Sequence, residues 1–230
     1  MRFELVGWPE DGVKLALDYR AFSYAGKFVV TNTGKAVALA PTDADTNPES
    51  EPGDGGDGDG DSDGDGDSDG DGDSDGDDDP RPPPATDVEG VVDPDGHVLG
   101  AIAFNADRTD PDTWWLRYVT VRGDRRGEGI GPRLVAFTTD RLRERGVERV
   151  RIAVNNPYAY EALYRAGFAF TGEETGIAEL VLSFPATDDS RETYQTGLDL
   201  FRERGPDADE RAFLDRKSGA DPPDLVDSLG

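Results

Sequence analysis

An aspartate- and glycine-rich tract in the first half of the chain limits most strongly what the sequence can fold into. The hexad Gly-Asp-Gly-Asp-Ser-Asp begins at Gly58, Gly64 and Gly70, and residues 54–79 hold 14 Asp and no cation. Gly, Asp and Ser bury almost no apolar surface, so they cannot offset the entropy lost when a backbone becomes ordered. Like charges at alternate positions also extend the chain. We therefore expect residues 41–86 to be a disordered insertion between two folded stretches.

A calcium site is the sharper alternative for this tract. Asp59, Asp61 and Asp63, followed by Gly64, match the start of an EF-hand loop. That loop needs a bidentate Glu at its twelfth position, where this sequence has Gly70, and no amphipathic helix pattern flanks the tract. We therefore favour a linker, with weak non-specific cation association as the alternative, and expect no metal cofactor.

The acidity extends beyond the tract. The chain has 50 acidic and 24 basic residues, and the 204 residues outside positions 54–79 still carry a net charge of −12. The cations are 20 Arg and only 4 Lys. A large acidic excess with little Lys is typical of a protein that works in concentrated salt, where screening removes the self-repulsion. We therefore expect a source such as a halophilic archaeon, and neither nucleic acid nor an anionic membrane as a partner.

The composition also excludes several classes of protein, because residues that those classes need are missing. With no Cys there is no disulfide framework or thiolate nucleophile, and a single His cannot form a His-rich metal cluster. The longest apolar runs are far shorter than the roughly 20 residues of a membrane-spanning helix, and the N-terminus has no signal-peptide core. We expect a cytoplasmic protein.

The order of elements predicts a mixed α/β sheet. Before the tract we expect a strand over residues 2–8 and an amphipathic helix from Leu15 through Tyr19 and Phe22 to Gly26. After it, residues 89–92 and 97–104 suggest a β-hairpin with an Asp-Gly turn. The remaining expected elements are strands 114–121 and 147–154, helices 132–145 and 158–166, a β pair formed by 168–170 and 176–184, and tail helices 190–205 and 209–217.

A glycine-rich turn between a strand and a helix is the most informative local pattern. Gly127, Gly129 and Gly131 let backbone amides converge and let a ligand approach closely, and the helix N-terminus adds a partial positive charge. Residues 122–151 also contain nine Arg against five acids, in a chain of net charge −26. The turn therefore predicts a phosphate site, and a diphosphate is its natural occupant. The spacing fits neither a P-loop nor a dinucleotide fingerprint.

The turn has the spacing Arg126-x-x-Gly129-x-Gly131, and a second motif runs from Asn156 to Leu-Tyr164-Arg-Ala-Gly-Phe168. Together they resemble the GNAT family of acetyl-CoA-dependent N-acyltransferases. The resemblance covers about residues 87–184 and implies a GNAT fold, a mixed central β-sheet flanked by helices. It suggests that residues 1–40 supply the first part of that domain, with 41–86 an insertion and 185–230 a helical C-terminal extension.

The resemblance also implies the site residues. In such enzymes the strand carrying Val119 and Val121 would pair with the pantetheine arm of acetyl-CoA, and Asn156 would help anchor it. Tyr164 would be the general acid that protonates the departing thiolate. Asn156 lies eight residues before Tyr164, one residue farther than in the commonest family form. The pyrophosphate would be held by Arg126, Gly127, Gly129, Ile130 and Gly131.

The implied reaction is direct attack of a primary amine on the thioester, with a backbone amide near Val119 polarising the carbonyl. The alternative function is a non-catalytic GNAT-fold module that binds acetyl-CoA or a protein. The amine acceptor is not identified, and both a homodimer and the role of the tail helices stay open. The candidate general bases, each as readily an ordinary surface residue, are Glu89, Asn105, Asp107 and Asp112.

Overall fold

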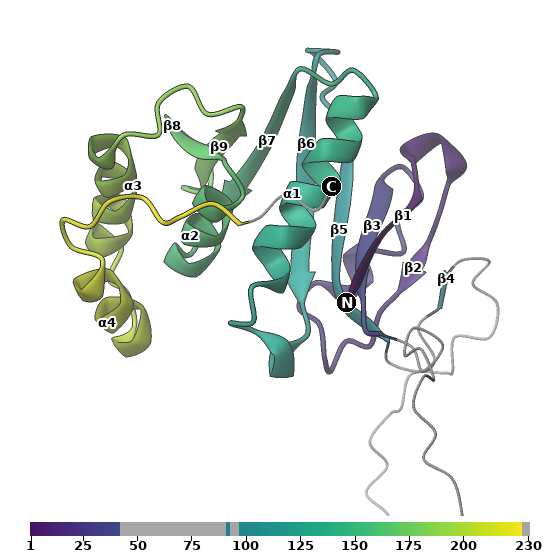
Figure 1. The fold of residues 1–230 in the computed structure, drawn as a ribbon, viewed down its shortest axis with the longest axis horizontal. Coiled ribbons are helices and arrows are strands. Elements are labelled where there is room, and N and C mark those ends of the chain that lie inside the picture. Colours follow the sequence, from purple (N-terminus) through teal and green to yellow (C-terminus); the bar gives the residue numbers. More distant parts are fainter. Residues whose placement is uncertain (42–90, 93–96, 227–230) are drawn as a thin grey trace, which may run out of the picture. The chain divides into compact units, whose positions relative to one another are not determined.

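The computed structural model describes residues 1–41, 91–92 and 97–226. A seven-stranded sheet forms the centre, with the order β1-β3-β5-β6-β7-β9-β8 (Figure 1). Every neighbouring pair is antiparallel except β6 and β7, which are parallel, so the predicted mixed sheet is confirmed. The strands are β1 (Arg2–Gly7), β3 (Gly34–Leu39), β5 (Val98–Ala106), β6 (Thr113–Val121), β7 (Arg149–Val154), β8 (Ala169–Glu174) and β9 (Leu180–Phe184).

Two hydrophobic clusters cover the two faces of the central strand β5. Ile102 and Phe104 pack on the face that carries helix α1 (Ile130–Glu144), whereas Ala101 and Ala103 pack with Phe28 on the other face. Burial on both faces explains why β5 is apolar almost throughout instead of alternating with polar residues. The two clusters fix the sheet against α1 on one side and against the N-terminal segment on the other.

Helices α1 and α2 (Pro157–Arg165) form where local signals place them. Asn156 caps α2 because its side chain accepts a hydrogen bond from Ala159 N at 2.8 Å. Gly146 and Gly167 follow the two helices with φ of 92° and 85°, a left-handed conformation that favours glycine. The helices begin within two residues of the predicted positions.

The predicted helix over residues 15–26 is wrong. Leu15–Ala16 forms a short strand, β2, and a turn follows in which the Asp18 carbonyl accepts from Phe22 N at 2.9 Å. Tyr24 has φ of 61°, which a helix does not tolerate. Leu15 on β2 and Phe22 in the turn are both buried, whereas Tyr19 between them is 62% exposed, so the helical spacing of the three residues does not reflect a helix. The short 3₁₀ helices here are η1 (Pro9–Asp11) and η2 (Ala25–Lys27).

The predicted hairpin is also wrong in its pairing. Strand β4 (Val91–Val92) pairs with β2 in parallel, in a separate two-stranded sheet. Both edges of β5 are already taken, by β3 and β6, so β5 has no free edge for a hairpin partner. The Asp-Gly turn of the prediction, and the tract over 42–86, lie outside the described residues.

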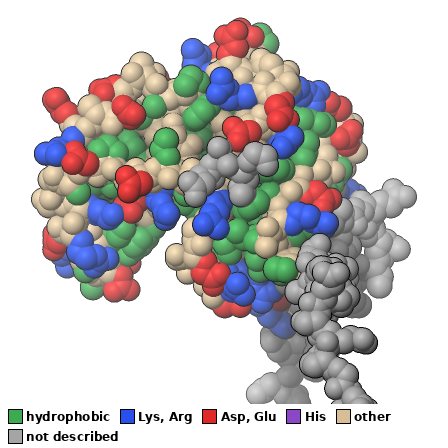
Figure 2. Space-filling model, in the orientation of Figure 1, with side chains coloured by type: hydrophobic (Ala, Val, Ile, Leu, Met, Phe, Trp, Pro, Cys, Tyr) green, Lys and Arg blue, Asp and Glu red, His purple; other side chains and the backbone are tan. Residues whose placement is uncertain are grey.

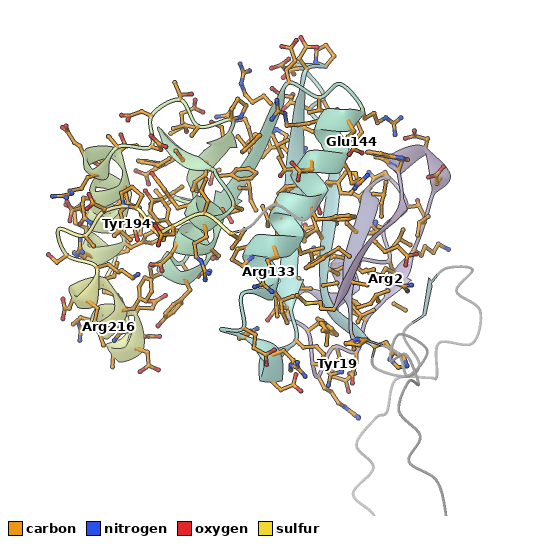
Figure 3. All side chains as sticks on the ribbon, in the orientation of Figure 1. Arg2, Tyr19, Arg133, Glu144, Tyr194 and Arg216 are labelled. Atoms are coloured by element: carbon orange, nitrogen blue, oxygen red, sulfur yellow. The ribbon has the colours of Figure 1, made fainter. Side chains whose placement is uncertain are left out.

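The tail forms helices α3 (Arg191–Glu203) and α4 (Ala208–Arg216), close to the predicted ranges. Tyr194, Leu198 and Phe201 of α3 are buried against the end of the sheet at β8. Tyr194 lies between α3 and α2, where its ring packs at 5.8 Å from that of Tyr160 (Figure 3). The tail therefore extends the core of the domain. Among the described residues, no helix is long and apolar enough to cross a bilayer.

Candidate functional site

Strands β6 and β7 diverge halfway along their length. They pair from Thr113 with Arg149 to Trp115 with Arg151, and within these two described strands the pairing ends there. On its other edge β6 stays paired with β5 as far as Val121. The register of that pair shifts around Arg117, which forms a β-bulge, and bulges bend a strand. One edge of β6 beyond Trp115 therefore faces an opening instead of a neighbouring strand.

The glycine turn lies at the end of β6. A 3₁₀ turn, η4 (Gly123–Arg125), leads to Gly127 with φ of 86° and then to Gly129 with φ of 75°. Gly129 is the N-cap of α1 and has no side chain to cap the helix, so the first amides of α1 lack a capping side chain. Free amides and the positive end of the helix dipole make an anion site at this point.

The N-terminal segment holds the turn in position. Arg126 Nη2 donates to Ser23 Oγ at 2.9 Å, and Gly123 N donates to the Ala21 carbonyl at 2.9 Å. The unexpected turns over residues 18–24 therefore support the turn before α1. Sequence reasoning missed this contact because it crosses 103 positions and carries no local signal.

These elements enclose one cavity of about 820 Å³, between β6, the end of β7, the start of α1, α2 and α4. Figure 2 shows the lower edge of the molecule indented between the α2–α4 side and the α1 side. Four Arg (117, 125, 126 and 165) and two acids (Glu161 and Glu179) line it, so its charge suits an anion. All eight residues predicted to bind the cofactor line this cavity: Val119, Val121, Arg126, Gly127, Gly129, Ile130, Gly131 and Asn156.

Tyr164 is not among the residues that line the cavity. Its side chain is buried, and its hydroxyl accepts a hydrogen bond from Phe170 N at 3.1 Å and lies 3.3 Å from the Tyr160 hydroxyl. Burial is the largest cause that raises the pKa of Tyr164 above its ordinary value. The preceding residue, Leu163, lines the cavity instead. The structure therefore brings the eight predicted cofactor residues together and places the Tyr164 hydroxyl in the core.

None of the described candidate bases lines the cavity either. Asn105 Oδ1 accepts from Arg117 Nε at 2.7 Å, and Asp107 accepts from Trp115 Nε1 at 2.6 Å. Hydrogen bonds from Thr109 and Trp115 hold the pKa of Asp107 well below its usual range. Asp107 is thus a persistent anion with its oxygens engaged. Glu89 lies outside the described residues.

Two features of the cavity had no signal in the sequence. Thr120 is buried on β6 and lines the cavity, and its Oγ1 has no hydrogen-bond partner in the described part of the chain. Phe213 of α4 also lines the cavity, although it comes from the tail. An alternating strand and a short tail helix do not reveal which side chain faces a ligand site.

Comparison with known proteins agrees with this geometry. Residues 65–168 match the sequence model of the acetyltransferase (GNAT) family, a range that includes both motifs and begins outside the described residues. This match, together with the mixed seven-stranded sheet and its flanking helices, gives the described part of the chain the GNAT fold. No curated protein matches the sequence significantly. The predicted domain boundaries stay predictions.

Solved structures resemble part of the chain. Nourseothricin acetyltransferase is 25% identical with a TM-score of 0.36, and the match covers 40% of this chain and 61% of that one. A GCN5-related N-acetyltransferase from Kribbella flavida is 24% identical with a TM-score of 0.35, over 40% and 62%. The PaiA N-acetyltransferase from Thermoplasma acidophilum, in complex with coenzyme A, is 18% identical with a TM-score of 0.33, over 39% and 54%. This chain thus spans less than two thirds of the length of these proteins.

Proposed function

We propose that this protein transfers an acetyl group from acetyl-CoA to a primary amine. The observation that carries the proposal is the single cavity formed by the divergence of β6 and β7 together with the glycine turn at the start of α1. One end of such a cavity suits a diphosphate, and the other offers a strand edge to an extended, amide-bearing arm.

The residues present fit coenzyme A. The amides around Gly127 and Gly129 and the guanidinium of Arg126 would hold the diphosphate. The open edge of β6 at Val119 and Val121 would hydrogen-bond the pantetheine amides. The unpartnered hydroxyl of Thr120 offers a further donor and acceptor on the same strand. The carbonyl oxygen of the Asn156 side chain already caps α2, and its amide nitrogen donates to Asn155 Oδ1 at 3.3 Å, so the second hydrogen of that nitrogen would contact the cofactor.

When bound, acetyl-CoA supplies a thioester carbonyl that an amine can attack directly. The nitrogen–carbon bond forms, the carbon–sulfur bond breaks, the amine loses a proton and the thiolate gains one. A backbone amide of β6 near Val119 would polarise the carbonyl. Protonation of the thiolate by Tyr164 stays a prediction, because its hydroxyl would have to leave the contact with Phe170 N to reach the cavity.

The buried hydroxyl of Tyr164 favours a second candidate function, a GNAT-fold module that binds acetyl-CoA without turnover. Such a module would keep the glycine turn and the open strand edge while lacking an accessible acid. The two functions differ in whether free thiol is released.

The experiment is to incubate the full chain with acetyl-CoA and a panel of primary amines, and to measure free thiol together with the mass of each amine. We expect thiol release coupled to amine acetylation, and loss of both in Arg126→Glu. Arg133→Glu makes the same charge change on the exposed side of α1 and should retain activity, since Arg133 does not line the cavity (Figure 3). Binding without acetylation of any amine would favour the non-catalytic module. Equal activity in Arg126→Glu would contradict the proposed site.

A further inference from the structure

The C-terminal extension contributes an aromatic surface to the cavity. Phe213 of α4 and Tyr158 of α2 both line it, and their ring centroids are 4.8 Å apart at an interplanar angle of 54°. Tyr158 is 45% exposed and Phe213 is partly exposed, so both rings keep apolar surface that protein atoms do not cover. Phe213 lies beyond residue 168, where the family match ends. We call Tyr158 and Phe213 the aromatic pair.

Helix α4 is held firmly, so the aromatic pair is fixed before any ligand binds. The Asp207 side chain caps the helix by accepting from Asp209 N and Glu210 N, both at 2.9 Å. Leu214, next to Phe213, is buried in the main core. Lys217 Nζ forms an ion pair with Glu161 of α2 at 2.8 Å. A side chain on an anchored helix loses little conformational freedom on binding.

The charges around the aromatic pair favour a neutral ring over a phosphate. Burial, followed by the acids Asp207, Asp209 and Glu210, raises the pKa of Tyr158. Three carboxylates close enough to act on this phenol would repel an anion placed beside it. Two cations also lie near the Phe213 ring, Arg216 at 5.9 Å and Lys217 at 5.7 Å, and Lys217 is already paired with Glu161. A planar, uncharged and polarisable group suits this surface, because such groups stack on aromatic side chains.

We propose that Tyr158 and Phe213 form a stacking platform for the adenine ring of coenzyme A. This inference rests on the proposed function, since it assumes the diphosphate at the glycine turn. Coenzyme A extends from its diphosphate in two directions, as a pantetheine arm and as an adenine nucleotide. The open edge of β6 offers hydrogen bonds to the amides of the first. The aromatic pair offers stacking to the second.

Another aromatic pair, Tyr24 and Tyr118, also lines the cavity, but it lies on the other face of the sheet. Tyr118 packs with the cluster that contains Phe28, on the face opposite α1. The N-terminus of α1 and the whole of α2 lie on the face of the main core. Tyr158 and Phe213 line the same cavity as the glycine turn, so a nucleotide that continues from the start of α1 on this face would be directed toward them.

The test is to measure the dissociation constants of coenzyme A and of 4′-phosphopantetheine, which lacks the nucleotide, by calorimetry. We compare the full chain with Phe213→Ala and with Phe213→Leu, which keeps an apolar side chain but has no ring. Stacking of a base on an aromatic side chain corresponds to roughly a tenfold change or more in affinity. We expect both variants to bind coenzyme A about tenfold more weakly and to bind 4′-phosphopantetheine as the original chain does. Their melting curves without ligand show whether α4 stays folded.

Two results would overturn the platform while the proposed function stands: unchanged affinity for coenzyme A in both variants, or an equal loss for both ligands in variants that melt normally. If Phe213→Ala unfolds α4, Phe213→Leu alone decides between these outcomes. Failure of the original chain to bind either ligand would overturn the proposed function and the platform together. Failure of the stacking platform can therefore be distinguished from failure of the proposed function.

Discussion

Replacing Tyr164 by Phe tests whether its hydroxyl serves the core or the chemistry. The change removes one oxygen, which accepts from Phe170 N at 3.1 Å inside the main hydrophobic core. A buried donor that loses its acceptor costs about 1–3 kcal/mol. For a chain of this size, 1 kcal/mol corresponds to about 2–4 °C in the melting midpoint. We therefore expect Tyr164→Phe to melt about 2–12 °C lower than the original chain.

The assay combines thermal melting with thiol release from acetyl-CoA. If the hydroxyl is structural, Tyr164→Phe loses stability while turnover, measured well below the new midpoint, stays within a few-fold of the original. Tyr158→Phe is a matched control for the midpoint, because it removes the same hydroxyl group from a tyrosine that is 45% exposed. That control should leave the midpoint unchanged. An unchanged midpoint with collapsed turnover in Tyr164→Phe would refute this reasoning and support the general-acid prediction.

Two further predictions concern stability. Gly197→Ala should destabilise the fold by about 1–3 kcal/mol, because its new methyl group would overlap the Tyr160 hydroxyl, and denaturant melts measure this. Gly176→Ala is the control, since its Cβ would meet nothing within 4 Å, and an equal loss there would contradict the packing argument. Burial lowers the pKa of Lys35 to about 8. The unfolded chain, with a lysine pKa of about 10.4, therefore binds more protons between these values, and stability should rise with pH across this window by up to about 3 kcal/mol. Urea melts across that window would show a flatter pH dependence in Lys35→Met, and an unchanged dependence would refute the assignment.

Local signals in the sequence were sufficient for the part of the fold that builds the cavity. The strand β6, the glycine turn, α1, β7 and α2 follow from alternating apolar residues, from Pro132 in the first turn of α1 and from glycines at 146 and 167 that end the helices. Each of these signals acts within a few residues. The eight residues predicted to bind the cofactor lie together because they belong to these elements or to the turns between them.

Long-range pairing could not be read in the same way. Leu15 and Phe22 have helical spacing, yet Leu15 reaches the core from the short strand β2 and Phe22 from a turn closed by the Asp18 carbonyl. The parallel pairing of β2 with β4 joins segments more than seventy positions apart, and no local pattern specifies it. Tertiary contacts, and not the spacing of apolar residues along the chain, determine the secondary structure and the pairing of such segments.

The position of Tyr164 shows how a single residue changes a side chain's surroundings. Successive residues on a helix differ in direction by about 100°. Tyr164 is eight residues after Asn156, one more than in the commonest form of the family, and the structure has Leu163 on the cavity. Tyr164 is the next residue after Leu163 and its phenol is buried in the core. The sequence shows the spacing between Asn156 and Tyr164. Which of the two neighbours, Leu163 or Tyr164, faces the cavity depends on the rotation of α2 about its axis, which only the structure gives.

A binding measurement with two glycine variants tests the central claim, that the turn before α1 holds the diphosphate of acetyl-CoA. Gly129 and Gly146 lie at opposite ends of α1, have φ of 75° and 92°, and a Cβ on either would meet nothing within 4 Å. Ala at either position should therefore cost about 1–2 kcal/mol of backbone strain. Only Gly129 lines the cavity.

The measurement is the melting midpoint in concentrated potassium chloride at increasing acetyl-CoA, since a ligand of the folded state raises it by mass action. We predict a dose-dependent rise for the original chain, the same rise from a lower starting point for Gly146→Ala, and little or no rise for Gly129→Ala. No rise in the original chain, or an equal rise in Gly129→Ala, would contradict the account.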